Sequence, residues 1–169
     1  MSELINYRGV SIFQDERAVV NRVLDVQARA AKLFDLPWLV PGGTICEPVD
    51  LPVNKRHLDM VYAHIRYSDR AFLGSITAPE RAADSVEMAR ILFGEAFTDQ
   101  NCVVMGNFNT TSPLVIDGVT AAGIRTYAAA NQGSIHLPFL LGGAVAPLTT
   151  AGMVAQGFAE SMASCALAQ

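Results

Sequence analysis

Two stretches in the second half of the chain have the same layout and decide the fold. Residues 102–114 read CVVMGNFNTTSPL, and residues 135–152 read IHLPFLLGGAVAPLTTAG. Each begins as an apolar strand and changes into a polar or glycine-rich loop, after which the pattern predicts a helix. Repeated strand–loop–helix units are typical of α/β proteins, which keep their functional sites at the carboxyl ends of parallel strands.

The composition predicts one deeply buried domain. The chain has 169 residues, of which 51% are hydrophobic and only 17% are charged. No Asp, Glu, Lys or Arg occurs from residue 126 to residue 159, which indicates burial on all sides. The formal net charge of −4 argues against a nucleic-acid partner, which would favour a basic surface.

The sequence also argues against a membrane or secreted protein. The apolar run 137–148 is interrupted by proline and glycine, and a membrane helix needs roughly 18 or more continuous apolar residues. The amino terminus lacks the basic and apolar segments of a signal peptide. Because the three cysteines are far apart in sequence, we expect reduced thiols in a cytoplasmic protein.

Helix and strand signals along the chain predict further units of the same kind. We expect an N-terminal strand and helix within residues 1–36 and four strand–helix units within residues 37–169. Each unit has ~30 residues, the length of a βαβ repeat. The expected helix starts are a cap at Asn54, a capping box at residues 77–80, a cap at Asp117, and a cap at Thr149 or Thr150. The helix capped by Asp117 is expected to run to Asn131, with Gly133 as its left-handed stop.

Four such units amount to about half of a TIM-type (β/α) barrel, or to a small open doubly wound sheet. A complete barrel needs ~250 residues, so this chain cannot close one alone. The last expected helix has almost no polar face. We therefore expect a homo-oligomer or a complementing barrel half to cover that helix.

Three segments carry a resemblance to a known family. They are GGAVAPLTTAG at residues 142–152 with the following Val-Ala-Gln at 154–156, the block Asn107–Leu114, and Pro-Gly-Gly at 41–43 with Glu-Pro-Val-Asp at 47–50. These segments resemble the "GATAPVTLAGALAQ", "N…SPL" and "GG…PVDVP" stretches of the trimethylamine methyltransferase (MttB-like) family, also called the glycine betaine methyltransferase family. The similarity extends from about residue 25 to the end.

The resemblance implies that this chain corresponds to a middle portion of a longer TIM barrel. It implies transfer of a methyl group from a methylated amine, such as trimethylamine or glycine betaine, to the Co(I) of a separate corrinoid protein. On that basis we expect no cofactor bound directly by this chain, because the partner protein carries the corrinoid (cobalamin). Archaeal members carry pyrrolysine at a position that would lie beyond Gln169, and many bacterial relatives lack it.

The implied chemistry suggests what to look for at the strand ends. A quaternary ammonium is a large, weakly hydrated cation that aromatic faces bind, and positioning supplies most of the rate. The transfer needs no proton for a quaternary substrate, so we expect no strong acid/base motif, and the catalytic residues stay unknown. Our candidate substrate-binding residues are Asn107, Phe108, Asn109, Ser112, Gly142 and Gly143.

Each candidate also has a structural interpretation. Strand alternation points Asn107 and Asn109 one way and Phe108 the other. The asparagines and Ser112 are also suited to capping loops, and Phe108 is suited to a core. Residues 142–143 are suited either to close approach of a ligand or to a tight turn with positive φ.

Histidines and metal-binding patterns give little support for other chemistry. His57 and His64 are seven residues apart, which we interpret as a solvated helix face, and His136 as a core histidine of a buried strand. No His/Cys/Asp group has metal-ligand spacing, so we expect no metal site. No nucleotide-binding motif occurs.

Three hypotheses stay open at this point. The chain is part of a corrinoid-dependent methylamine methyltransferase, or it is an inactive half-barrel that acts only as an assembly partner. The third hypothesis is a different TIM-barrel enzyme whose glycine loops hold an anion. It is the weakest, because the nearest basic residue upstream of Gly142 is Arg125.

Overall fold

The computed structural model describes residues 51–67 and 72–169. They belong to two compact units, residues 1–70 and 71–169, which are described separately. The N-terminal strand and helix predicted within residues 1–36, and the part of the first strand–helix unit that falls within residues 37–50, lie outside the described residues.

In the first unit the structure describes helix α2 (Val53–Tyr67). The backbone N–H groups of Lys55 and Arg56 both donate to the carbonyl of Pro52, at 2.9 and 3.0 Å. The helix therefore begins one residue before Asn54, and the predicted cap at Asn54 is wrong.

The prediction of a solvated histidine face on α2 is also wrong. His57 and His64 are both buried, together with Val61 between them. Spacings of three and four residues place these side chains on the same side of a helix, so the histidines share the buried side with an apolar residue. Burial lowers the pKa of His64, because it disfavours the charged imidazolium.

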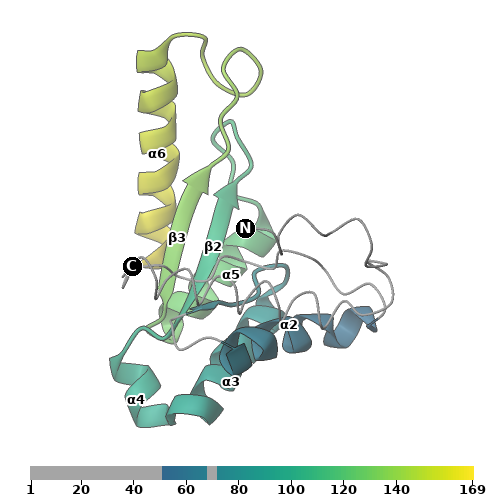
Figure 1. Ribbon diagram of the computed structural model, residues 1–169. Coiled ribbons are helices and arrows are strands. Elements are labelled where there is room, and N and C mark those ends of the chain that lie inside the picture. The colour runs from purple at the N-terminus through teal and green to yellow at the C-terminus, as the bar shows by residue number, and fades with distance from the viewer. Residues whose placement is uncertain (1–50, 68–71) are drawn as a thin grey trace, which may run out of the picture. The chain divides into compact units, whose positions relative to one another are not determined.

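The second unit is built on a parallel three-stranded sheet, which confirms the α/β class (Figure 1). Its strands, in the spatial order β1-β2-β3, are β1 (Phe72–Leu73), β2 (Val104–Thr110) and β3 (Gly133–Pro138). The helices are α3 (Pro79–Phe93), α4 (Glu95–Gln100), α5 (Gly118–Ala129) and α6 (Thr150–Ala168). Each of β1, β2 and β3 is followed by a helix, as predicted.

The two faces of this sheet differ. Val104, Phe108 and Thr110 of β2 are buried on the face that α3, α5 and α6 cover. The ring of Phe108, for example, meets the edge of Tyr127 of α5, with 5.8 Å between the ring centroids. Asn107 and Asn109 alternate with these residues and therefore lie on the other face.

Several boundaries differ from the prediction. The loop expected from Gly106 onward begins only after Thr110, so Asn107 and Asn109 lie within strand β2. Gly133 does not end α5, because it is the first residue of β3 and the positive φ of 55° belongs to Asn131. Helix α5 itself begins where it was predicted to begin, since Asp117 accepts from the N–H groups of its first turn.

Of the predicted caps of the other two helices, one is wrong and one is confirmed. Ala78, which has no capping side chain, is the N-cap of α3, so the predicted capping box at residues 77–80 is wrong. The Thr77 hydroxyl instead accepts from the Arg81 guanidinium at 2.9 Å. The cap of α6 is Thr149, whose hydroxyl accepts from the N–H of Gly152.

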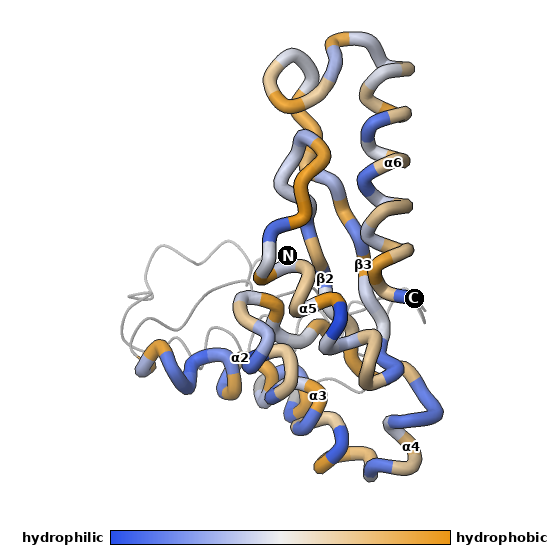
Figure 2. The backbone as a smooth tube through the Cα atoms, turned by 180° about the vertical axis from the view of Figure 1, so that it is seen from behind, coloured by the Kyte–Doolittle hydropathy of each residue, from blue (hydrophilic) through white to orange (hydrophobic). Residues whose placement is uncertain are grey.

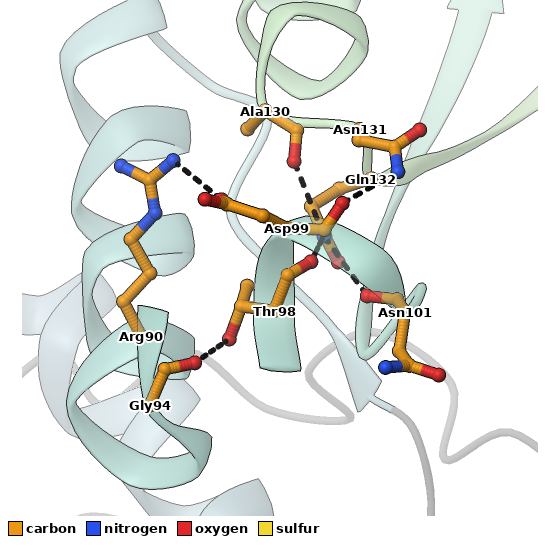
Figure 3. A network of polar contacts seen from close by, with 8 residues as sticks. All are labelled: Arg90, Gly94, Thr98, Asp99, Asn101, Ala130, Asn131 and Gln132. Atoms are coloured by element: carbon orange, nitrogen blue, oxygen red, sulfur yellow. Dashed lines mark hydrogen bonds and ion pairs between the residues drawn. The ribbon is translucent and has the colours of Figure 1, made fainter. Parts of the chain in front are cut away.

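A buried glutamine closes the amino-terminal edge of the sheet (Figure 3). The side-chain oxygen of Gln132 accepts from the N–H groups of Val103 and Val104 at 2.9 and 3.2 Å. Its nitrogen donates to the carbonyls of Thr98 and Asn101 at 2.7 and 3.1 Å. One side chain thus links α4, the start of β2 and the segment between α5 and β3.

We predict that Gln132→Ala lowers the free energy of unfolding by about 2–4 kcal/mol, because it leaves several buried backbone groups without partners. Urea unfolding followed by circular dichroism measures the change. Gln100→Ala, at an exposed glutamine at the end of α4, is the matched control and should shift stability by less than about 0.5 kcal/mol. Equal destabilisation by the two variants would contradict this role of Gln132.

Candidate functional site

Two loops leave the carboxyl-terminal edge of the sheet. The β2 loop comprises residues 111–117 and the β3 loop comprises residues 139–149. Both project beyond the strand ends (Figure 1), and both contain strongly hydrophobic segments (Figure 2). Because β2 and β3 are parallel, this is the edge at which α/β proteins bind ligands.

Helix α6 carries a buried carboxylate, that of Glu160, which bonds the carboxyl end of β2. Glu160 is only 3% exposed. One of its oxygens accepts from the hydroxyls of Thr110 and Ser112, the latter at 2.7 Å. The other accepts from the N–H of Leu114 and the side-chain amide of Gln156, each at 2.9 Å.

The same network reaches the second loop. The Gln156 amide nitrogen also donates to the carbonyl of Val145 at 2.8 Å. The end of β2, the β2 loop and the β3 loop are thereby connected through two side chains of one helix, Gln156 and Glu160.

The hydrogen bonds keep this carboxylate ionised. Burial acts to raise the pKa of Glu160, but the bonds from Thr110, Leu114, Ser112 and Gln156 act against it and lower the pKa to about 2. Within residues 51–67 and 72–169, the structure pairs no cation with this carboxylate. Neutral donors therefore stabilise the charge.

Glu160 is not among the site residues predicted from the sequence, although the sequence contains a signal for it. Glu160 is the only Asp, Glu, Lys or Arg from residue 126 to residue 169. A lone carboxylate in such an uncharged segment is expected to be buried with several hydrogen-bond donors, because a buried charge without them is costly.

The two candidate asparagines lie on the sheet face opposite the helices of the unit. Asn109 is exposed and pairs with Leu137 of β3, and Asn107 pairs with Ile135. The side-chain oxygen of Asn107 is buried and has no hydrogen-bond partner within the described residues. An unpaired amide oxygen at this depth is available to a ligand or an ordered water.

Phe108 lies on the opposite side of the sheet from the asparagines. It is 2% exposed and lies between the rings of Tyr127 and His136. A Cβ atom at Gly123 would approach the Phe108 ring to 2.7 Å, so the glycine makes room for it. This placement fits the core interpretation, and the Phe108 ring is not available as a cation-binding face.

The remaining candidates take part in loop structure. Ser112 donates to Glu160. Gly143 has a φ of 81° and donates its N–H to the carbonyl of Ala146 at 2.7 Å, while a Cβ at Gly142 would meet the sulfur of Met153 at 2.9 Å. These contacts fit the tight-turn interpretation of residues 142–143.

No cluster of His, Cys, Asp or Glu in the described part of the chain is arranged to hold a metal ion. His136 instead forms a hydrogen bond with the Ser134 hydroxyl at 2.9 Å, and burial lowers the pKa of its ring. None of the helices found in residues 51–67 and 72–169 has the length and apolar character to span a membrane.

The second unit is an α/β unit with polar side chains near the carboxyl ends of its parallel strands, where α/β proteins keep their functional sites. Residues 23–169 match the family model "Trimethylamine methyltransferase (MTTB)", so the chain is a member of the trimethylamine methyltransferase family, as the sequence motifs predicted. It is 39% identical over 129 residues to a glycine betaine methyltransferase of Desulfitobacterium hafniense (strain Y51). The match covers 76% of this chain and 27% of that relative, so the chain spans about a quarter of the relative's length.

We predict an acid-dependent loss of stability that depends on Glu160. The pKa of this carboxyl is about 2 in the folded chain and ordinarily 4.5, so the unfolded chain binds the proton first as pH falls. The stabilisation is therefore complete above about pH 5 and is lost as pH falls from 4.5 towards 2. Urea unfolding at a series of pH values measures it, and Glu160→Gln should flatten this part of the curve. An unchanged curve would contradict the prediction.

We predict that Phe108→Leu lowers the free energy of unfolding by about 1–3 kcal/mol, because a buried aromatic ring is replaced by a smaller side chain. Any affinity of the chain for glycine betaine or trimethylamine, measured by calorimetric titration, should be the same in this variant as in the unchanged chain. A large loss of affinity in a variant of nearly normal stability would instead support Phe108 as a binding residue.

Proposed function

We propose that this chain supplies substrate-binding residues to an enzyme that transfers a methyl group from a methylated amine to a corrinoid protein. Membership of the trimethylamine methyltransferase family supports the reaction class. The observation that carries the proposal is the position of Asn107 and Asn109. They lie near the carboxyl end of a parallel strand, on the face away from α3, α5 and α6.

The sheet supports the proposed barrel architecture. In a (β/α) barrel the helices surround the outside and the other face of the strands lines the interior. In the described part of the second unit, the buried residues of β2 face the helices and the asparagines face away. We propose that residues 1–169 form part of one barrel domain, about half a barrel, and that Asn107 and Asn109 line its interior.

The proposed site binds and orients the amine. The side-chain amides of Asn107 and Asn109 are suited to donate to a carboxylate such as that of glycine betaine. Leu137, which is half-exposed on the same face and pairs with Asn109, is suited to contact N-methyl groups. Holding the N–CH3 bond in a fixed direction contributes to rate through orientation.

The exposed side chains of the two loops suit a partner that carries a corrinoid. Leu114, Phe139, Leu141 and Leu148 are all exposed and apolar, and such side chains fit the apolar parts of a large planar ring system. When its carrier protein is bound, the corrinoid would supply the Co(I) that accepts the methyl group. No residue of this chain is assigned to hold the corrinoid itself.

A second candidate function is that of an assembly partner without catalysis. The surface of α6 that the described residues leave exposed carries Val154, Phe158 and Met162. Spacings of four residues align these side chains along the helix. A complementing barrel half or a second copy of the chain would bury this apolar stripe.

A combined binding and transfer experiment tests the proposal. We expect the purified chain to bind glycine betaine or trimethylamine in calorimetric titration. With a corrinoid protein reduced to Co(I), we expect the visible absorption to change as the methyl group is transferred. The variant Asn107→Ala/Asn109→Ala should weaken glycine betaine binding about tenfold or more, since two hydrogen bonds to its carboxylate are lost. Asn101→Ala is the control, because Asn101 precedes the amino-terminal end of β2. This variant should bind the amine with normal affinity.

Absence of both amine binding and methyl transfer would contradict the enzyme proposal. If such a chain also forms a defined oligomer in light scattering, or binds a complementing barrel half, the result supports the assembly-partner function.

A further inference from the structure

The hydrogen bonds of Glu160 extend well beyond its own helix. They reach residues 46 to 50 positions earlier in the chain, at Leu114, Ser112 and Thr110. Asp117 provides a contrast, because its carboxylate accepts from Val119 and Thr120 in the first turn of the helix that it caps. A capping role therefore does not explain the partners of Glu160.

The bond to Thr110 connects Glu160 with the candidate substrate residues. Thr110 is the last residue of β2, and its side chain points to the helix side of the sheet, where Glu160 accepts from it. Asn109 is its neighbour in sequence and points to the opposite side. Holding Thr110 on one face therefore fixes the direction of Asn109 on the other face.

The bond to Leu114 stabilises an unfavourable backbone conformation. Leu114 has a φ of 58°, in the left-handed region that a residue with a Cβ rarely adopts. Its N–H donates to the Glu160 carboxylate at 2.9 Å. A charge-assisted hydrogen bond of this kind helps to keep the β2 loop in its observed path.

Gln156 extends this restraint to the β3 loop. Its amide nitrogen bonds both the Glu160 carboxylate and the carbonyl of Val145. The two loops at the carboxyl edge thus have a common anchor, although they are separated in sequence by α5 and β3.

We propose that Glu160 is a positioning residue of the site, whose carboxylate fixes the end of β2 directly and the β3 loop through Gln156. This arrangement holds Asn107 and Asn109 in the orientation that binds the methylated amine. The inference rests on the proposed function for the identity of the substrate. Its mechanical part, the restraint of the two loops, rests on the observed hydrogen bonds. The low pKa of Glu160 agrees with it, since the anchor stays charged at neutral pH.

Hydrogen–deuterium exchange of the full chain tests the mechanical part. In Glu160→Gln we expect the amides of residues 111–115 and 142–146 to exchange about tenfold faster or more, because charge-assisted bonds that restrain both loops are lost. Gln156→Leu should accelerate exchange in residues 142–146 while residues 111–115 stay protected. Asp99→Asn, which removes an exposed carboxylate near the opposite edge of the sheet, should change neither loop.

Calorimetric titration with glycine betaine and trimethylamine tests the functional part on the same variants. We expect amine affinity to fall about tenfold in Glu160→Gln, to fall less in Gln156→Leu and to be unchanged in Asp99→Asn. Normal affinity in Glu160→Gln with loosened loops would overturn the positioning role. Unchanged exchange in Glu160→Gln would overturn the anchor itself.

Two further outcomes distinguish a failure of this inference from a failure of the proposed function. If the unchanged chain binds neither amine, the proposed function fails and the substrate part of this inference with it, while the exchange data still decide whether Glu160 anchors the loops. If Glu160→Gln does not fold, Ser112→Ala and Gln156→Leu replace it. Ser112→Ala removes the hydroxyl bond to Glu160, and Gln156→Leu removes the amide bonds to Glu160 and to Val145. Protection retained in both loops by both variants would overturn the proposal.

Discussion

The structure around the carboxyl edge depends on the need to satisfy one buried negative charge. Removing a carboxylate from water is costly unless hydrogen bonds replace the lost solvation, and Glu160 receives four, all from neutral donors. Those donors come from the end of β2, the β2 loop and α6 itself. The requirement thus positions the helix against the strand end and restrains the loop between them.

A second constraint, the packing of the Phe108 ring, determines which residues of β2 lie on each face of the sheet. Its ring needs space between the sheet and α5, and the absence of side chains at Gly106 and Gly123 provides that space. With Phe108 and Thr110 committed to the helix side, alternation leaves Asn107 and Asn109 on the other side. The site therefore depends on core packing as well as on its own polar residues.

The sequence predicted what depends on local pattern and missed what depends on distant partners. The apolar run before Gly106, the cap at Asp117 and the cap at Thr149 identified elements of the α/β unit, because these signals act within a few residues. The extension of β2 through Thr110 was missed, since pairing with β3 overrides the low strand propensity of glycine and asparagine. The role of Glu160 was missed because three of its four partners lie 46 to 50 residues away.

Helix α6 carries polar side chains that face the sheet and apolar side chains that are exposed. Glu160 and Gln156 bond the loop edge of the sheet, while Val154, Phe158 and Met162 leave an apolar stripe exposed among the described residues. A soluble helix normally places its charges outward, but the only charge of α6 is directed inward. A barrel half or a second copy of the chain packed on this stripe would contact the same helix that anchors the two loops. Assembly would then restrict the motion of α6, so the geometry of Asn109 would depend on the partner as well as on Glu160.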